Sequence, residues 1–225
     1  MKCNCHEREN QNCIELVPIF SNLTKEEMFE IAMITSEKSL EKGESIYHAG
    51  DRHDSLYVIH KGRVKITRFS ESGKEQILRI LGPGQFMGEL TLFSKELTKD
   101  NAVAMEKTIM CKIDSQDLKG LMSRFPSIAL KILEELSQRL EKAETLVEDI
   151  SLSSVEKRIA KSIVDMEKDG LVQLHMTKGD WASHLGMSQE SLSRKLGQLQ
   201  DAGIIRLEGH RKIHVLDSER LEEIE

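Results

Sequence analysis

The stretch Met176–Lys195, MTKGDWASHLGMSQESLSRK, decides the fold of the C-terminal part of this chain. Thr177 is a favourable N-cap, so a short helix is expected to begin directly after it. Gly186 can supply the tight turn at which two helices meet at a steep angle. Ser188 is a second N-cap, and the residues after it predict another helix over 189–200. Together these signals predict a helix-turn-helix.

One face of the second predicted helix carries the residue types that read DNA bases. Glu190, Ser193 and Arg194 are spaced i, i+3 and i+4, so they share one stripe. Arg can bridge the two acceptors of guanine, Glu can accept from the amino group of cytosine, and Ser can reach a base or a phosphate. The remaining contacts with double-stranded DNA are expected from Thr177, Lys178, Ser188, Gln189 and Lys195. The alternative is an ordinary helical hairpin with a solvated polar face.

Two further strands are expected after the helix-turn-helix, in IIRLEGHRKIHVLD, with a turn at Glu208–Arg211. This pattern predicts a wing whose His210, Arg211 and Lys212 contact phosphates. The net charge of the chain is −6, yet the segment 178–212 holds six basic and four acidic residues. Such a weakly basic surface favours sequence-selective binding with a clear salt dependence.

Length and composition limit the remaining possibilities. The 225 residues are enough for one large domain or two smaller ones, with 39% hydrophobic and 31% charged residues. No apolar run approaches the ~20 residues that span a membrane. The N-terminus is polar and lacks the apolar core of a signal peptide. We expect a cytoplasmic protein without membrane contact.

The chain is predicted to be α+β, with four parts. Residues 1–20 form a Cys-rich leader and residues 21–125 a β jelly-roll barrel, because glycines there separate many short apolar alternations. One hairpin is expected around Lys61-Gly62-Arg63, and another turn at Ser70–Gly73. Residues 126–151 are expected to form one long helix, and residues 152–225 the winged helix-turn-helix.

The long helix is predicted to pair with a second copy. Pro126 begins it, and the serines of Ser151–Ser154 break it. Apolar residues recur along it at 4,3 spacing, which is typical of a coiled-coil seam, and polar residues flank them. The seam residues are Ala129, Leu133, Leu136, Leu140, Ala143, Val147 and Ile150. We expect a homodimer, and the alternative is a single buried helix.

The chain has four cysteines, and three of them stand in the leader. Cys3, Cys5 and Cys13 lie in a polar segment with no packing period, so a shared ligand or redox role is favoured there. Cys111 alternates with Ile109 and Ile113, which is typical of a buried strand residue. Structural disulfides are not expected in a cytoplasmic protein.

In order and lengths of its parts, nearly the whole chain resembles the CRP/FNR family of bacterial transcription regulators. The Glu-x-x-Ser-Arg stripe is similar to the FNR branch, which reads TTGAT-type half-sites; the CRP branch has an extra Arg where this chain has Gln189. The resemblance implies a regulator that binds a near-palindrome as a homodimer, with RNA polymerase as a partner if it activates. No catalytic arrangement supports an enzyme.

The resemblance also gives the cysteines a role. In the FNR branch, three N-terminal cysteines and one barrel cysteine hold an oxygen-labile 4Fe–4S cluster, and EKTIMCKI resembles the segment that carries the fourth ligand, here Cys111. The leader departs from that pattern, because one residue separates Cys3 from Cys5 and seven separate Cys5 from Cys13, against two and five in the FNR branch.

Three chemistries therefore compete for Cys3, Cys5, Cys13 and Cys111: the 4Fe–4S cluster, a thiol–disulfide switch, and zinc with His6 as a spare ligand. The disulfide switch is implied because the leader through LVPIF resembles FNR-like proteins of low-GC Gram-positive bacteria that use one. The alternative function is a regulator whose barrel binds an unidentified small-molecule effector, with the cysteines incidental.

Cyclic AMP is not expected to be that effector. Relatives that bind it use a Gly-Glu-Leu segment for the ribose and an Arg-Ser-Ala segment for the phosphate. This chain keeps Gly88-Glu89-Leu90 but has Asp100-Asn101-Ala102 at the second position, where an aspartate would repel phosphate. Lys99 is the nearest base in the sequence, and Glu89 is expected to accept hydrogen bonds from backbone N–H groups.

Overall fold

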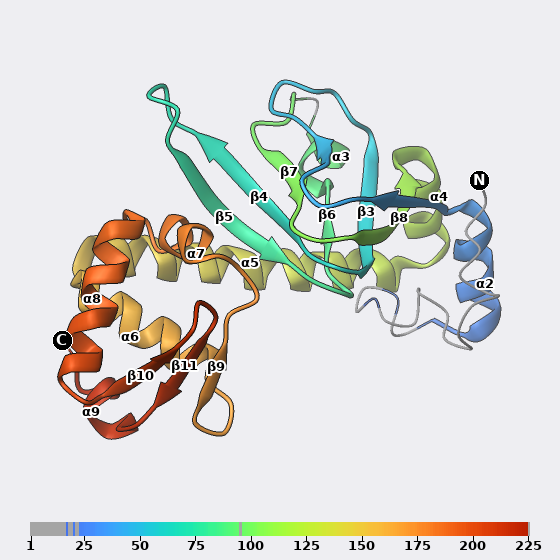
Figure 1. Ribbon diagram of the computed structural model, residues 1–225. Coiled ribbons are helices and arrows are strands. Elements are labelled where there is room, and N and C mark those ends of the chain that lie inside the picture. Colours follow the sequence, from blue (N-terminus) through green and yellow to red (C-terminus); the bar gives the residue numbers. More distant parts are fainter. Residues whose placement is uncertain (1–16, 18–19, 21–22, 95, 225) are drawn as a thin grey trace. The chain divides into compact units, whose positions relative to one another are not determined.

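The computed structural model describes residues 17, 20, 23–94 and 96–224 (Figure 1). The chain forms two compact units, and the boundary between them falls after Arg139, inside one long helix; residues 74–77 group with the second unit. None of the helices in the described ranges is both long and apolar enough to cross a membrane.

The N-terminal unit is built on two four-stranded sheets, in the orders β1-β8-β3-β6 and β2-β7-β4-β5. The first sheet consists of β1 (Ser36–Leu40), β3 (Ser55–Lys61), β6 (Phe86–Met87) and β8 (Thr108–Asp114). The second consists of β2 (Ser45–Tyr47), β4 (Val64–Phe69), β5 (Glu75–Leu81) and β7 (Asn101–Ala104). The helices of this unit are α2 (Lys25–Ile34), α3 (Glu89–Phe93) and α4 (Ser115–Arg124). The predicted β-rich fold of the N-terminal part is confirmed.

The hairpin expected at Lys61-Gly62-Arg63 is wrong. The chain does turn there, but β3 continues into β4 by changing from one sheet to the other. Gly62 has φ 92°, and a Cβ at that position would lie 2.6 Å from the carbonyl oxygen of Lys107, so the corner requires glycine. The second turn is confirmed, because Gly73 N–H donates to the Ser70 carbonyl at 2.9 Å between the neighbouring strands β4 and β5.

Alternating burial on the strands produces two apolar layers in this unit. One layer lies between the sheets and includes Ile59, Ile66, Met87 and Met110. The other lies between the first sheet and the helices, and includes Ile31, Leu56, Ile113, Leu118 and Ile128. Because α2 and α4 each bury one apolar face against β3 and β8, these helices cover a single face of the first sheet.

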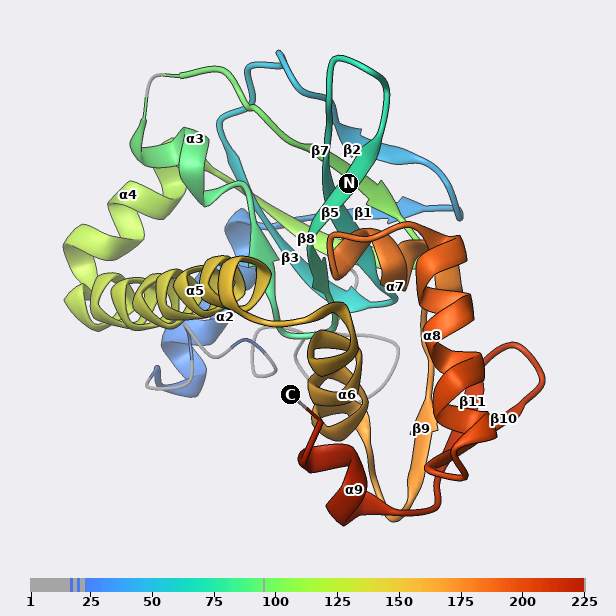
Figure 2. The ribbon, with the colours of Figure 1, turned by 90° about the vertical axis from the view of Figure 1, so that its left-hand side faces the viewer.

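Helix α5 (Pro126–Leu152) begins where Pro126 predicts, but it ends later than expected. Ser151 still belongs to the helix, and the break falls at Ser153 and Ser154, as Figure 2 shows between α5 and α6. Early in α5, the side chains of Ile128 and Ile132 are buried in the barrel core, and Leu136 packs partly against it. Large exposed apolar side chains lie elsewhere on α5, at Leu130, Leu133, Leu140 and Val147.

The C-terminal unit contains α6 (Val155–Met166), β9 (Leu171–Gln173), α7 (Lys178–His184), α8 (Gln189–Asp201), β10 (Ile205–Glu208), β11 (Lys212–Val215) and α9 (Ser218–Glu222). Its strands form one antiparallel sheet in the order β10-β11-β9. Trp181 is fully buried at the centre of the core, and its Nε1–H donates to the Ser162 hydroxyl of α6 at 2.9 Å. The winged helix-turn-helix predicted from the sequence is therefore present.

Candidate DNA-binding and sensor sites

Two local caps fix the ends of the helix-turn-helix. The Thr177 hydroxyl accepts from the Asp180 N–H at 3.0 Å, and the Asp180 carboxylate accepts in return from the Thr177 N–H at 3.4 Å. Ser188 caps α8 by accepting from the Ser191 N–H at 3.1 Å. Gly186 has φ 71° between the two helices. Both predicted N-caps and the glycine turn are confirmed, and the carboxylate of Asp180 completes a capping box that the sequence analysis missed.

The packing of α8 exposes the predicted reading stripe. Leu192, Leu196 and Leu199 are buried against the core of the C-terminal unit. Because these leucines fix which face of α8 points inward, Glu190, Ser193 and Arg194 lie together on the exposed face. A carboxylate, a hydroxyl and a guanidinium are thus available to a groove of DNA from one face of a single helix.

The other side chains expected to contact DNA differ in how exposed they are and in whether they already make contacts within the protein. Thr177 and Ser188 are exposed, but both hydroxyls are used as caps. Gln189 leans over Gly179, where an added Cβ would lie 3.0 Å from the Gln189 Oε1. Lys195 is half-buried and pairs with Glu156 of α6, so its ammonium group is engaged inside the unit. Lys178 is also half-buried, in the first turn of α7.

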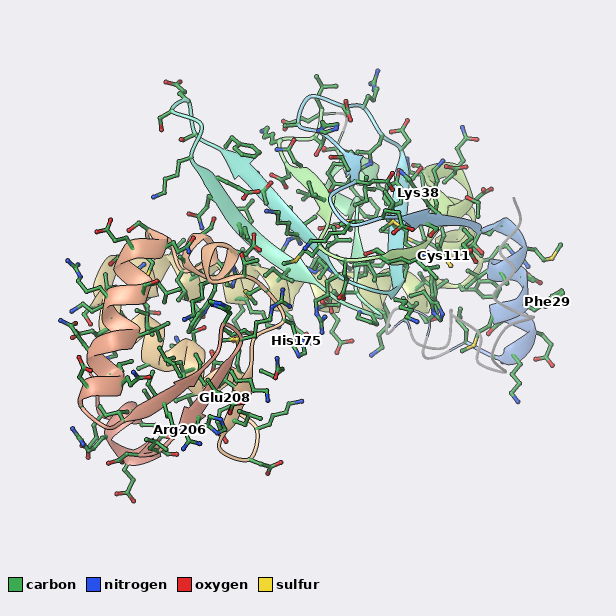
Figure 3. The ribbon with its side chains drawn as sticks, viewed as in Figure 1. Phe29, Lys38, Cys111, His175, Arg206 and Glu208 are labelled. Carbon is green, nitrogen blue, oxygen red and sulfur yellow. The ribbon has the colours of Figure 1, made fainter. Side chains whose placement is uncertain are left out.

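The wing is the hairpin of β10 and β11, in which Glu208 pairs with Lys212 and Arg206 with His214. Gly209 has φ 61° and begins the turn, and His210 and Arg211 in the turn are exposed. Figure 3 shows Arg206 and Glu208 on this hairpin. The predicted phosphate-contacting residues therefore stand at an exposed tip, together with the acidic Glu208.

Cys111 lies on β8, between Glu37 of β1 and Val58 of β3. It is 4% exposed, so the expectation of a buried strand residue is confirmed (Figure 3). Together with Val17 and Phe20 it lines a small, mostly apolar cavity.

The three leader cysteines Cys3, Cys5 and Cys13, and His6, lie outside the described residues. Within the described part of the chain, no group of three or more His, Cys, Asp or Glu residues could hold a metal ion.

The Gly-Glu-Leu segment has a different role from the one expected. Gly88 has φ 93°, and a Cβ there would lie 2.3 Å from the Ser55 carbonyl oxygen. Glu89 is 2% exposed, and its Oε1 accepts from Arg79 at 3.2 Å and from Arg139 at 3.0 Å. The expectation that Glu89 binds backbone N–H groups is wrong. Two arginines, from β5 and α5, hold it instead, and neither is near it in sequence.

Arg139 joins α5 to the Gly88-Glu89-Leu90 segment. Besides Glu89, its guanidinium donates to the Phe86 carbonyl at 2.9 Å and lies 4.2 Å from the centre of the Phe86 ring. These contacts join the first half of α5 to the start of β6 and to Glu89 by hydrogen bonding, ion pairing and cation–π stacking. Glu89 is thus bonded directly to α5 through Arg139.

Beside Glu89 lies a second small cavity, whose wall also includes Tyr47, His53, Arg79 and Asp100. Asp100 is 4% exposed and accepts from Arg68 at 2.6 Å. The base at this cavity is Arg79 of β5. Lys99, which the sequence analysis took as the nearest base, pairs with Glu96 on the surface instead.

Comparisons with known proteins agree with this architecture. Residues 37–125 match the cyclic nucleotide-binding domain, and residues 157–224 match the Crp-like helix-turn-helix domain. The cyclic AMP receptor protein of Thermus thermophilus is 30% identical over 209 residues, covering 92% of this chain and 96% of that protein. A probable transcriptional regulator, flp, of Lacticaseibacillus casei is 26% identical over 94% of this chain and 97% of its own length.

A similar fold occurs in the solved structure of FixK2 from Bradyrhizobium japonicum, with a TM-score of 0.74 and 23% identity over 85% of this chain and 98% of that one. Relatives with the name anaerobic regulatory protein also match, including one from Pasteurella multocida at 29% identity over 79% of this chain and 67% of that protein. The two matched domains and the relatives that span both of them lead to one conclusion. The chain belongs to the CRP/FNR family of DNA-binding transcription regulators, which are not enzymes.

Proposed function

We propose that this regulator reads a near-palindromic TTGAT-like DNA site as a homodimer, and that its DNA affinity responds to oxygen or redox state. The observation that carries the DNA-reading part is the exposed stripe of Glu190, Ser193 and Arg194 on α8. Its residue types suit a major-groove reader, and Gln189 stands where the CRP branch has another Arg. In the same proposal, the regulator acts in the cytoplasm and contacts RNA polymerase if it activates transcription.

The homodimer is supported by the apolar side chains that α5 leaves exposed. Leu133, Leu140 and Val147 are 59%, 61% and 65% exposed and follow one another at intervals of seven residues. A heptad line of this kind is buried when two such helices pair. Ala143 is also exposed, whereas Leu136 already packs partly on the barrel core, so the expected seam shifts away from Leu136. The side chain of Ile150 lies outside the described residues.

Redox sensing is supported by the surroundings of Cys111. Val17, which follows Cys13 by four residues, lines the same cavity as Cys111. Since an extended chain advances by roughly 3.3–3.6 Å per residue, this tether is short enough for a leader thiol to reach Cys111. Four thiolates would suit a 4Fe–4S cluster, one pair would suit a disulfide switch, and zinc is the third chemistry.

Anaerobic purification, followed by an absorption spectrum and iron, sulfide and zinc analysis, tests the sensor. A broad visible band that oxygen bleaches, with about four iron atoms per chain, is the result expected for a cluster. Colourless protein without iron would exclude the cluster, and thiol counting before and after oxidant would then test the disulfide. The matched variant is Cys111→Ser, which should abolish the response of DNA binding to oxidant whether the sensor is a cluster or a disulfide.

A second candidate function is a regulator whose barrel binds a small-molecule effector, and the match of residues 37–125 to the cyclic nucleotide-binding domain favours it. We propose that cyclic AMP is not this effector. Arg79 is already paired with Glu89, and the carboxylate of Asp100 lies on the cavity wall, where it would repel a phosphate. An unchanged redox response in Cys111→Ser would favour the effector function over the redox function. Equilibrium dialysis with cyclic AMP is expected to show no binding, and micromolar binding would contradict this part.

A further inference from the structure

At the tip of the wing, one carboxylate engages two cationic or titratable side chains of β11. Lys212 Nζ lies 3.3 Å from Oε1 of Glu208, and His214 Nε2 lies 2.6 Å from Oε2. The side chains are exposed by 55% at Glu208, 46% at Lys212 and 26% at His214. These hydrogen bonds, first from His214 and then from Lys212, lower the pKa of the Glu208 carboxyl below its usual value. The wing tip thus carries a persistent anion at neutral pH.

Glu208 stands alone among basic residues. It is the single acidic residue in the sequence between Asp201 and Asp217, a segment that also holds Arg206, Arg211 and Lys212. Arg206, Arg211 and Lys212 are all exposed, as is His210 in the turn. Without Glu208, this hairpin would present only positive or neutral side chains to DNA.

A DNA phosphate and Glu208 compete for the same ammonium group. If Lys212 is to contact a phosphate, as predicted from the sequence, its Nζ must leave the Glu208 carboxylate or share its hydrogens with it. In either case the carboxylate stays next to the DNA backbone, where like charges repel each other. Phosphate contacts carry no base information, so this cost falls equally on every DNA sequence.

We propose that Glu208 limits the affinity of the wing for DNA by competing with phosphate for Lys212, leaving sequence discrimination to α8. The proposal rests on DNA contact by the wing, which is part of the proposed function. It predicts that this hairpin, although rich in basic residues, contributes little to the binding of random DNA. The carboxylate is a positioning residue, because it acts through Lys212 and contacts no base.

The test is the dissociation constant of Glu208→Gln for an operator-type duplex and for a random duplex of equal length, over a series of salt concentrations. Both affinities are expected to rise about 3- to 10-fold, and the plot of log K against log salt should steepen by up to ~0.9, the value for one more neutralised phosphate. Glu223→Gln removes the same charge from an exposed position after α9 and should change affinity less than twofold. Unchanged or weaker binding by Glu208→Gln would overturn the proposal.

The double variant Glu208→Gln/Lys212→Gln separates competition from simple repulsion. If Glu208 acts through Lys212, its removal should give no gain in affinity once Lys212 is replaced. A gain of equal size in the double variant would show direct repulsion of the DNA and overturn the proposal. If adding Lys212→Gln to Glu208→Gln leaves binding unchanged, the released Lys212 does not contact phosphate and the proposal also fails. In that last case, a loss of operator binding in Arg194→Ala would still show that α8 reads DNA.

Discussion

Among individual residues, Arg194 gives the sharpest test of DNA reading. Its side chain is exposed on α8, beside Glu190 and Ser193. Arg194→Ala should cost ~1–3 kcal/mol of binding free energy at the specific site and little on random DNA, because a base contact is lost. Fluorescence anisotropy with both duplexes measures this, and Glu223→Gln, an exposed change outside α8, is the control. An equal loss on both duplexes would contradict base reading.

Gly88 is the residue at which a single methyl group should be least tolerated. A Cβ there would meet the Ser55 carbonyl at 2.3 Å, and φ is 93°, so Gly88→Ala carries both a clash and backbone strain. We expect a loss of at least about 1–3 kcal/mol in the free energy of unfolding. The matched change is Gly120→Ala in α4, where nothing lies within 4 Å and where the helix should gain about 0.5–1 kcal/mol. Similar melting temperatures for the two variants would refute this contrast.

His53 should make the barrel sensitive to mild acid. It stacks on Tyr47 with 4.3 Å between ring centroids, and burial lowers its pKa. Because the folded pKa lies below the unfolded value of 6.5, the unfolded state binds more protons in that window, and stability falls as the pH drops through it.

The urea midpoint, followed by far-ultraviolet circular dichroism, should therefore decrease from about pH 7.5 to about pH 5.5. His53→Gln should reduce that decrease. The same pH dependence in the variant and in the wild type would show that another group is responsible.

At the scale of secondary-structure elements, the exposed apolar line of α5 allows a test of the proposed homodimer. Leu140→Glu should dissociate the homodimer, because it places a charge on the exposed apolar line of α5. The control is Gln138→Glu, which adds the same charge at an exposed position about 160° around the helix from Leu140. Light scattering coupled to gel filtration measures the mass of each variant. A dimer in both, or a monomer in both, would contradict the proposed seam.

Local signals predicted the elements well, and long-range contacts account for what was missed. The caps at Thr177 and Ser188 act within three residues of their own helices, so the sequence alone locates them. The corner at Gly62 looked like a hairpin because a turn pattern does not reveal which sheet each strand will join. Sequence periodicity likewise could not show that Leu136 packs on the barrel.

At the candidate site, too, features set by local spacing were predicted and contacts between distant parts of the chain were not. The reading stripe on α8 was predicted from spacing within one helix, and the structure confirms its exposure. Arg79 and Arg139 were missed as partners of Glu89, because they lie 10 and 50 residues away in sequence. Lys195 looked free to bind phosphate, whereas an acidic residue of α6, 39 positions earlier, holds it.

At the scale of the whole molecule, one boundary between the two compact units falls within a helix rather than in a loop. The boundary follows Arg139, and α5 continues unbroken to Leu152. Arg139 itself contacts Glu89 and Phe86, so the anchor of α5 in the N-terminal unit is the last residue before the boundary. Ser153 and Ser154 are the first residues after this boundary at which the helix is interrupted.

The aromatic residues divide the optical properties of the chain between its two units. The single tryptophan, Trp181, is fully buried in the C-terminal unit, and both tyrosines, Tyr47 and Tyr57, are buried in the barrel. Excitation at the red edge of the absorption spectrum selects indole, so emission then reports on the DNA-binding unit alone, while phenol absorbance reports on the sensor. The unmodified protein thus carries one chromophore type per unit, and the order in which the two units melt can be resolved without any label.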